Sequence, residues 1–310
     1  MSPSSGLSEK EKEELSVPIA RVIADPSSLS ASFERAVGEI EQAGLSLALS
    51  QIIDEAEGVV EMSFANGTPT EIHQILRHAM PGSDILVGEK SIEIPQLFIS
   101  DMDSTIIGQE CIDELADYAG LKPQIAEITE RAMQGELDFK EALRERVGLL
   151  AGLDEKAITD CLAERIVPNE GARELVSTLK SKGTRTVLVT GGFHHFADEI
   201  GRQLGFDRVV GNRLAVSDGK LAGTLVGPIV DSTAKRATLE EERRALGEHA
   251  VVMACGDGAN DIPMLEEAHY GVAYHGKEAA LKASNGSIAR GSLSGLLVLL
   301  QIPRDEFVSE

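Results

Sequence analysis

Two aspartates follow a short apolar run near the middle of the chain. In LFISDMDST, residues 97–100 are typical of a buried strand, and Asp101 and Asp103 come directly after it. Because side chains two positions apart in extended backbone point to the same side, the two carboxylates should face one place. Close carboxylates repel each other unless a cation or a shared proton intervenes. Aspartate oxygens suit Mg²⁺, which binds a few carboxylates together with water and phosphate oxygens.

Other polar groups follow two further apolar runs. Asp257 comes after AVVMAC and is a third candidate metal ligand. Thr190 ends RTVLVT and precedes Gly191 and Gly192, whose N–H groups can approach an anion closely if a helix begins there. Lys235 lies at the start of a predicted helix and offers a fixed positive charge. Taken singly, each of these features is more often an ordinary turn or a surface residue.

The three segments share one pattern, and this shared pattern supports a functional interpretation of the single residues. Each has an apolar, β-rich run, then a polar or glycine-rich turn, then a helical pattern. Such runs predict parallel strands buried on both faces, and their alternation with helices predicts an α/β fold with a doubly wound parallel sheet. Ligands of open α/β sheets bind at the carboxyl ends of the strands. We therefore expect the three polar clusters to meet in space.

A charged segment between the first two strands shows a different pattern. Residues from about 110 to 165 are rich in helical periodicity and contain no strand pattern, which predicts a helical cap inserted over the crevice. After the second strand, GNRLAVSDGKLAGT has two β-like runs around an Asp-Gly pair. That pair is a strong hairpin signal.

The residues that precede these three segments predict a second unit. Residues 1–16 form a polar, acidic leader that we expect to be disordered, and residues 17–90 alternate short β-like and helical runs in the order βαββαβ. This order is the ferredoxin-like pattern of an α+β domain. Residues 91–310 would then form the catalytic domain. His73 and His78 are not accompanied by other candidate metal ligands, and we interpret them as ordinary packing or surface residues.

Two rival motifs fail on particular positions. A calcium loop starting at Asp101 or Asp257 needs glycine at its sixth position, where Ile106 and Ile262 stand. GDGAND resembles part of a dinucleotide fingerprint, but the third glycine is missing, and its aspartates would repel a pyrophosphate.

The ordered set of segments resembles a known family. DMDST, VTGG, the downstream Lys235 and GDGAND are similar to the motifs of haloacid dehalogenase-type phosphatases, in the version found in phosphoserine phosphatases. The resemblance covers roughly residues 95–287 and includes the cap segment AMQGELDFKEALRERVGLL and the hairpin. One departure is Thr190, where serine is usual. The region of residues 17–90 resembles a divergent amino-acid-binding regulatory (ACT-like) domain.

The resemblance implies a role for each acidic residue. Asp101 would attack phosphorus and form an aspartyl-phosphate, which is a known use of a carboxylate in covalent catalysis. Asp103 would protonate the leaving oxygen and then accept a proton from water. Mg²⁺ would be held by the Asp101 and Asp257 carboxylates and the Asp103 backbone carbonyl. Asp261 would lie behind these ligands and orient them.

The resemblance also implies the substrate contacts. Thr190, Gly191 and Lys235 would hold the phosphate oxygens, with Asn260 nearby. In the cap, Glu110 would bind the ammonium of phosphoserine, and Arg146 its carboxylate by bidentate pairing. The apolar walls would be formed by Met133 and Phe139. The implied reaction is Mg²⁺-dependent hydrolysis of O-phospho-L-serine, the last step of serine biosynthesis.

Composition excludes some classes of partner. The 310 residues carry a formal net charge of −22, which opposes broad contact with nucleic acid or an anionic membrane. The longest apolar run is too short to span a bilayer. Three scattered cysteines without a C-x-x-C pair disfavour a disulfide framework and indicate a reducing cytoplasm. We expect a cytoplasmic enzyme with a small-molecule substrate, and a homodimer stays open.

Two alternatives stay open at this stage. The chain could act on another small phosphorylated amino acid or alcohol, such as phosphothreonine or phosphohomoserine. It could also be chiefly an amino-acid sensor with a vestigial phosphatase half, although Asp101, Asp103, Lys235 and Asp257 form an intact set. A third rival, an ion pump that uses an aspartyl-phosphate, lacks the membrane spans it would need.

Overall fold

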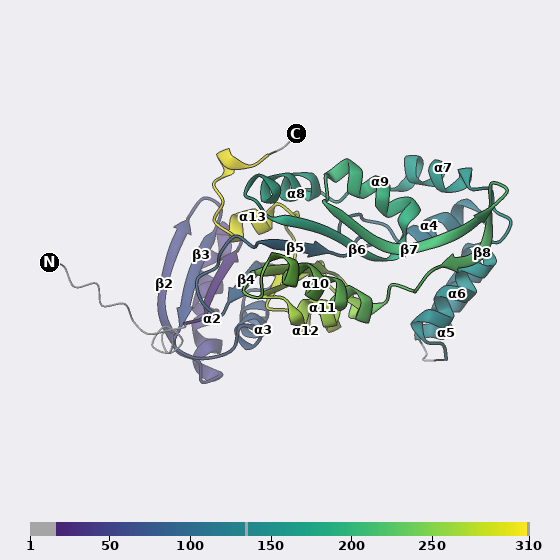
Figure 1. Ribbon diagram of the computed structural model, residues 1–310. Coiled ribbons are helices and arrows are strands. Elements are labelled where there is room, and N and C mark those ends of the chain that lie inside the picture. Colours follow the sequence, from purple (N-terminus) through teal and green to yellow (C-terminus); the bar gives the residue numbers. More distant parts are fainter. Residues whose placement is uncertain (1–16, 134–135, 309–310) are drawn as a thin grey trace.

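The computed structural model describes residues 17–133 and 136–308, and its first unit is a four-stranded antiparallel sheet with two long helices. Figure 1 shows this unit at one end of the molecule. Its elements are β1 Ile19–Ile23, α2 Leu29–Gln42, β2 Leu47–Asp54, β3 Val59–Phe64, α3 Pro69–Ala79 and β4 Asp84–Gly88, with a 3₁₀ turn η1 at Pro26–Ser28. The order follows the predicted βαββαβ pattern. The assignment of this unit as an ACT-like regulatory domain stays a prediction.

Local sequence explains where α3 begins and which side each of the two helices buries. In α3, Thr68 and Glu71 form a reciprocal capping box around Pro69 in the first turn. Its buried face is Ile72, His73, Leu76 and Ala79, and the corresponding face of α2 is Leu29, Ser32, Ala36 and Ile40. This spacing of three or four residues places one stripe of each helix on the sheet.

The second unit is built on a parallel sheet that supports the site. Its strands are β5 Leu97–Ser100, β6 Arg185–Phe193, β7 Arg208–Ser217, β8 Lys220–Val226, β9 Val252–Gly256, β10 Tyr270–Tyr274 and β11 Gly286–Ile288. The strand order is β2-β3-β1-β4-β11-β10-β9-β5-β6-β7-β8, because β4 pairs with β11 and joins the two units in one sheet. The active-site strands β5, β6 and β9 are neighbours.

Helices cover both faces of this parallel sheet, as Figure 1 shows. On one side lie α8 Ala172–Ser181, α9 His194–Leu204 and α13 Gly295–Leu299, and on the other α10 Ser232–Leu246, α11 Ile262–Glu267 and α12 Glu278–Ala283. In β5, Phe98 packs into the first layer, while Leu97 and Ile99 pack into the second. The predicted α/β doubly wound sheet is confirmed.

Four of the helices between β5 and β6 form the cap. These are α4 Cys111–Tyr118, α5 Lys122–Met133, α6 Phe139–Leu149 and α7 Lys156–Arg165. The β7–β8 hairpin turns at Asp218 and Gly219, both with positive φ (53° and 75°), and β8 packs on α6. Figure 1 shows the cap and the hairpin together at the end opposite β2.

One predicted boundary is wrong. The sequence indicated that the second strand stops at Thr190 and that Gly191 and Gly192 form a turn before a helix, but β6 continues through both glycines to Phe193, directly before α9 begins at His194. A register shift after Val189 carries the strand through the glycines. Within residues 17–133 and 136–308, no helix combines the length and apolar character needed to cross a membrane.

Candidate active site

Asp101 lies at the carboxyl end of β5, on the floor of a cavity of about 340 Å³. Its Oδ1 accepts a hydrogen bond from the Met102 N–H (2.8 Å) and lies 2.7 Å from Lys235 Nζ. Asp101 as a whole is 3% exposed. Burial raises its pKa well above the ordinary range, the charge of Asp261 adds to this, and Lys235 opposes both.

Lys235 is a buried cation between two carboxylates. It lies in the first turn of α10, which Asp231 caps by accepting the Ala234 N–H. The Lys235 side chain is 1% exposed, and its Nζ is 2.7 Å from Asp261 Oδ1 as well as from Asp101. Burial alone would lower the pKa of Lys235, but the two carboxylates outweigh it and raise the pKa. The lysine therefore stays charged at the floor of the cavity.

Three carboxylates form a cluster with the composition of a metal site. Asp101, Asp257 and Asp261 each offer one oxygen, and these oxygens all lie within 4.8 Å of one another. Asp257 follows β9, while Asp261 Oδ2 accepts the N–H groups of Asp257 and Gly258 at 3.1 Å. Hard carboxylate oxygens fit Mg²⁺, so these residues suit the predicted metal. Because Asp261 Oδ2 is occupied by backbone N–H groups, its main part is to hold the loop that carries Asp257.

Asp103 is held separately from this cluster. Its Oδ1 accepts the backbone N–H of Cys111 at 2.8 Å, and its Oδ2 accepts the Thr190 hydroxyl at 3.0 Å. The Gly192 N–H in turn donates to Thr190 Oγ1 at 2.8 Å. Burial raises the pKa of Asp103, and the hydrogen bonds from Cys111 and Thr190 oppose this. A carboxyl with a raised pKa at a fixed position is suited to proton transfer.

The cap closes the other side of the cavity. Glu110 precedes α4, Phe139 opens α6, and Arg146 lies near the end of α6, and all three line the cavity with Asp101 and Asp103. Ser104 Oγ donates to Glu110 Oε1 at 2.8 Å. The Phe139 ring packs against Gly191, where an added Cβ would lie 3.2 Å from the ring. The cap thus brings an acid, a base and an aromatic wall over the buried aspartates.

The two charged cap residues have shifted proton affinities. Although the Glu110 side chain reaches solvent at the mouth of the cavity, partial burial, followed by the charge of Asp103, raises its pKa to about 7. Burial lowers the pKa of Arg146, and Asp113 and Glu110 oppose that shift. A ligand that brought an ammonium to Glu110 and an anion to Arg146 would favour the charged form of both.

Most predicted site residues come together in this one cavity. Asn260, Thr190 and Gly191 line it, and Lys235 lies directly beneath Asp101. Met133 ends α5, but its side chain lies outside the described part of the structure.

The sequence analysis missed Lys277, whose Nζ is 2.9 Å from Asp257 Oδ2 and whose N–H donates to the Asp257 carbonyl. Lys277 follows β10, a fourth strand of the parallel sheet whose end carries no motif.

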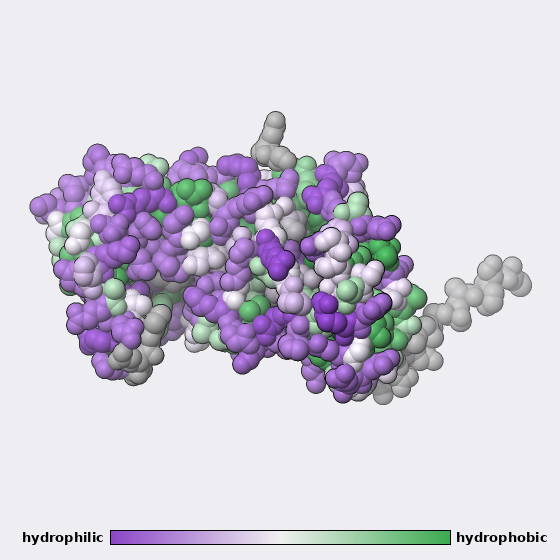
Figure 2. All heavy atoms as spheres, turned by 180° about the vertical axis from the view of Figure 1, so that it is seen from behind, coloured by the Kyte–Doolittle hydropathy of each residue, from purple (hydrophilic) through white to green (hydrophobic). Residues whose placement is uncertain are grey.

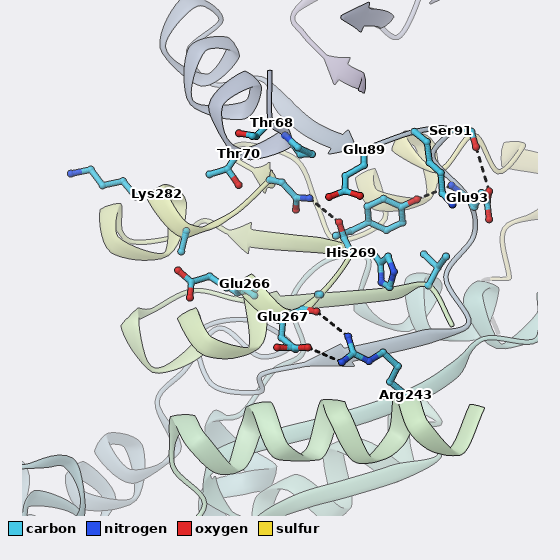
Figure 3. Close-up of a pocket in the computed structure, with 18 residues that line it drawn as sticks. Thr68, Thr70, Glu89, Ser91, Glu93, Arg243, Glu266, Glu267, His269 and Lys282 are labelled. Atoms are coloured by element: carbon cyan, nitrogen blue, oxygen red, sulfur yellow. Dashed lines mark hydrogen bonds and ion pairs between the residues drawn. The ribbon is translucent and has the colours of Figure 1, made fainter. Parts of the chain in front are cut away.

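A second cavity, of about 530 Å³, lies at the junction of the two units (Figure 3). It is lined by Thr68, Glu89, His269 and the Arg243–Glu267 ion pair (2.7 Å), which Figure 3 shows lying toward α10. Val251 and His269 precede β9 and β10, so this cavity is at the amino ends of the strands, away from the aspartates. The chemistry described above belongs to the smaller cavity.

Comparison with known proteins agrees with the ordered motifs. A model of haloacid dehalogenase-like hydrolases matches residues 98–266, which is more than half of the chain. The chain belongs to the haloacid dehalogenase-like hydrolases. Within residues 98–266 lie Asp101, Asp103, Lys235 and Asp257, so the site of this hydrolase falls inside the matched region.

Individual members of the family are also similar to this hydrolase. A phosphoserine phosphatase from Archaeoglobus fulgidus is 43% identical over 211 residues, which span 68% of this chain and 61% of that protein. The structure of a probable phosphoserine phosphatase from Vibrio cholerae is 30% identical with a TM-score of 0.71, and the match covers 93% of this chain and 87% of that one. A phospho-aspartyl intermediate analogue of phosphoserine phosphatase is 36% identical with a TM-score of 0.61, covering 66% and 98%.

Proposed function

We propose that this hydrolase cleaves O-phospho-L-serine to serine and phosphate through an aspartyl-phosphate on Asp101, and so releases free serine in serine biosynthesis. One observation carries the proposal. The buried Asp101–Lys235 pair forms the floor of a cavity whose cap side holds Glu110 and Arg146. The names of the Archaeoglobus relative and of the intermediate analogue support the substrate and the covalent step.

The first half-reaction follows from the two aspartates. Within the described chain, the Met102 N–H and Lys235 Nζ both contact Oδ1 of the Asp101 carboxyl, which leaves Oδ2 to attack phosphorus. As the new bond between Oδ2 and phosphorus forms, the bond between phosphorus and the serine oxygen breaks. Asp103, protonated at the start, gives its proton to that oxygen. Serine leaves as a neutral alcohol, and Asp103 is left as a carboxylate.

The second half-reaction reverses the proton role. Asp103 accepts a proton from a water molecule as the water oxygen attacks phosphorus, and the bond to Asp101 Oδ2 breaks. Asp103 keeps its position in both steps because Cys111 N–H and Thr190 Oγ1 hold its two oxygens. Phosphate then leaves, and both aspartates return to their starting states.

Charged residues of this chain would allow the site to bind a phosphate dianion. Asp101 and Asp257, with the Asp103 carbonyl, would hold Mg²⁺, which when bound offsets the repulsion between carboxylate and phosphate. Lys235 opposes the rise in the pKa of Asp101 and orients its carboxyl, and bound Mg²⁺ would further favour the ionised form that attacks. Asn260, Gly191 and Thr190 stay predicted phosphate contacts, and the Thr190 hydroxyl reaches Asp103 in this structure.

Three phosphate esters test the substrate directly. O-Phosphoserine has both charged groups, O-phosphoethanolamine lacks the carboxylate, and 3-(phosphonooxy)propionate lacks the ammonium. Charge-assisted hydrogen bonds contribute roughly 1.5–3 kcal/mol, which is about ten- to more than a hundredfold in kcat/KM. Arg146→Ala should therefore lower kcat/KM by that factor with phosphoserine and change it little with phosphoethanolamine. Glu110→Gln should lower kcat/KM by that factor with phosphoserine and change it little with 3-(phosphonooxy)propionate.

A neighbouring arginine provides the control. Arg144 lies on the same helix with an exposed side chain and is not among the residues that line the cavity, so Arg144→Ala should leave all three activities near wild type. Equal losses on the three esters in Arg146→Ala and Glu110→Gln would assign both residues to cap closure and would remove the support for phosphoserine.

A further inference from the structure

One buried polar side chain beside the active site has no part in the proposed mechanism. Asn212 lies on β7 and is 2% exposed. Figure 2 shows a largely hydrophilic surface at the end of the molecule that holds the cap and the hairpin, whereas Asn212 of the hairpin strand is buried. A buried amide takes its hydrogen-bond partners from within the protein. The partners of Asn212 are backbone groups of two segments that carry active-site residues.

The first partner is the carbonyl of Gly191, near the end of β6. Regular pairing between β6 and β7 breaks after Val189 and resumes at Phe193, which pairs with Asn212. Across this break the Asn212 side chain donates from Nδ2 to the Gly191 carbonyl oxygen at 2.7 Å. The side chain thus supplies the hydrogen bond that regular strand pairing does not, at a glycine that lines the active-site cavity.

The second partner is the backbone ahead of α10. The Val230 N–H donates to Asn212 Oδ1 at 2.8 Å. Val230 precedes Asp231, whose carboxylate caps α10 and pairs with Lys140 of the cap helix α6 at 2.8 Å. Because an N–H only donates and a carbonyl only accepts, the two partners settle which end of the amide faces each of them. Asn212 therefore joins the end of β6 to the first turn of α10.

A continuous chain of hydrogen bonds leads from Asn212 to Asp103. The carbonyl of Gly191 and the N–H of Gly192 belong to one planar peptide group, so a bond that fixes the carbonyl also fixes the N–H. The Gly192 N–H donates to Thr190 Oγ1 at 2.8 Å, and that hydroxyl donates to Asp103 Oδ2 at 3.0 Å. Since the Gly192 N–H only donates, Thr190 keeps its own proton for Asp103. The last bond in the chain therefore depends on the first.

We propose that Asn212 is a positioning residue that orients Asp103 for proton transfer to the leaving oxygen. This role rests on the proposed function, because it requires Asp103 to act as the acid. The Cys111 N–H contacts only Oδ1, and a carboxyl held at one oxygen can swing about that contact. The bond from Thr190 to Oδ2 removes this freedom, and Asn212 keeps that bond in place. A misplacement of about 1 Å in a catalytic group can slow a reaction about a hundredfold.

Two leaving groups test this role. We define the leaving-group ratio as kcat/KM with p-nitrophenyl phosphate divided by kcat/KM with O-phosphoserine, whose leaving oxygen needs a proton. Asn212→Ala should raise this ratio about tenfold or more, because proton transfer limits only the second ester. Both values come from one enzyme preparation, so the folded fraction cancels and the ratio stays measurable in a less stable variant.

A second asparagine provides the matched control. Asn285 also uses both ends of its amide on backbone groups, accepting the Gly271 N–H at 2.7 Å and donating to the His269 carbonyl at 2.8 Å, but it lies at the junction of the two units. Asn285→Ala should lower the unfolding temperature and leave the leaving-group ratio at the wild-type value. In an Asp103→Asn background, Asn212→Ala should not raise the ratio further, because the acid on which it acts is already absent.

Three results would overturn the proposal. The leaving-group ratio of Asn212→Ala could stay at the wild-type value, whether or not both activities fall, as expected of a residue that only supports the fold. The ratio could rise as much in Asn285→Ala. An unchanged ratio in Asp103→Asn would remove the acid role from the proposed function, and this role of Asn212 with it.

Failure of the proposed substrate would be distinguishable from these results. If the wild-type enzyme released no phosphate from O-phosphoserine, the proposed substrate would be wrong. The leaving-group ratio would then be measured with O-phosphoethanolamine in its place, since that alcohol also needs a proton to leave. Asn212→Ala should raise this ratio in the same way, and a wild-type value would again overturn the role of Asn212.

Discussion

Lys235 Nζ lies 2.7 Å from Asp101 Oδ1, at a depth where the lysine is 1% exposed. This pair joins α10 to the end of β5, two elements separated by more than 130 residues in the chain. Two carboxylates, Asp101 and Asp261, share the one ammonium, so the site carries excess negative charge that a metal ion would relieve. The nucleophile, the phosphate-binding cation and the metal ligands of the proposed mechanism therefore depend on one another.

Removing the lysine should cost both stability and activity. Lys235→Met leaves two buried carboxylates without their cation, and breaking a buried pair in this way typically costs about 3–5 kcal/mol. Urea unfolding of the metal-free protein should show a loss of this size. The control is Lys277→Met, because Lys277 is exposed and its pair with Asp257 should contribute less than about 1 kcal/mol. Similar losses in the two variants would mean that the Lys235 pair is no more important to the fold than a surface pair.

Asp103→Asn should slow the reaction in a way that depends on the leaving group. Proton transfer by a positioned carboxyl contributes about 10²–10⁴-fold, and an amide cannot supply it. The loss should be large with phosphoserine, and it should shrink in the phosphorylation step with p-nitrophenyl phosphate, whose leaving group needs no proton. Burst kinetics separate that step from hydrolysis of the intermediate. An equal loss for both leaving groups in the burst would remove the acid role from Asp103.

A methyl group next to Asp103 should have a related effect. A Cβ at Gly192 would lie 2.6 Å from Asp103 Oδ2 and 3.1 Å from Thr190 Oγ1, so Gly192→Ala must displace the carboxylate. We expect kcat to fall by at least about tenfold while the fold is kept, since a small shift of a catalytic group is costly. Gly148→Ala is the control, because a Cβ there meets no atom within 4 Å. Unchanged kcat in Gly192→Ala would show that Asp103 need not hold this position.

The sequence predicted Asp101, Asp103 and Asp257 because each follows an apolar run that forms a buried strand, and that pattern is local. It did not predict Lys277, since the YHG before it resembles an ordinary loop. It also did not show that β4 joins β11, because Gly286–Ile288 is a strand of three residues whose pairing depends on tertiary contact. The boundary at Thr190 failed for a related reason. Two glycines are typical of a strand end, but here pairing with β7 resumes beyond them at Phe193, and Asn212 of β7 donates to the Gly191 carbonyl at 2.7 Å.

The junction of the two units should carry a pH dependence through His73. This buried histidine contacts Ser287 Oγ on β11 at 2.9 Å, and burial lowers its pKa to about 4 from an ordinary value of 6.5. Because the folded state resists protonation, its stability is full above pH 6.5 and is lost as the pH falls toward 4. The lowered pKa corresponds to about 3 kcal/mol at most. His73→Gln keeps a polar side chain and should remove this part of the pH dependence in urea unfolding; an unchanged slope between pH 6.5 and 4 would contradict the assignment.

The covalent step is the central claim, and the fate of the Asp101 carboxyl tests it most directly. The enzyme would be mixed with Mg²⁺ and excess O-phospho-L-serine, quenched in acid during turnover and digested, and the peptide that contains Asp101 would be weighed by mass spectrometry. The account predicts that a fraction of this peptide gains the mass of one phosphoryl group, and that Asp101→Asn shows neither the added mass nor turnover. Full turnover with an unmodified peptide, or appreciable turnover by Asp101→Asn, would contradict it and would assign the attack to water.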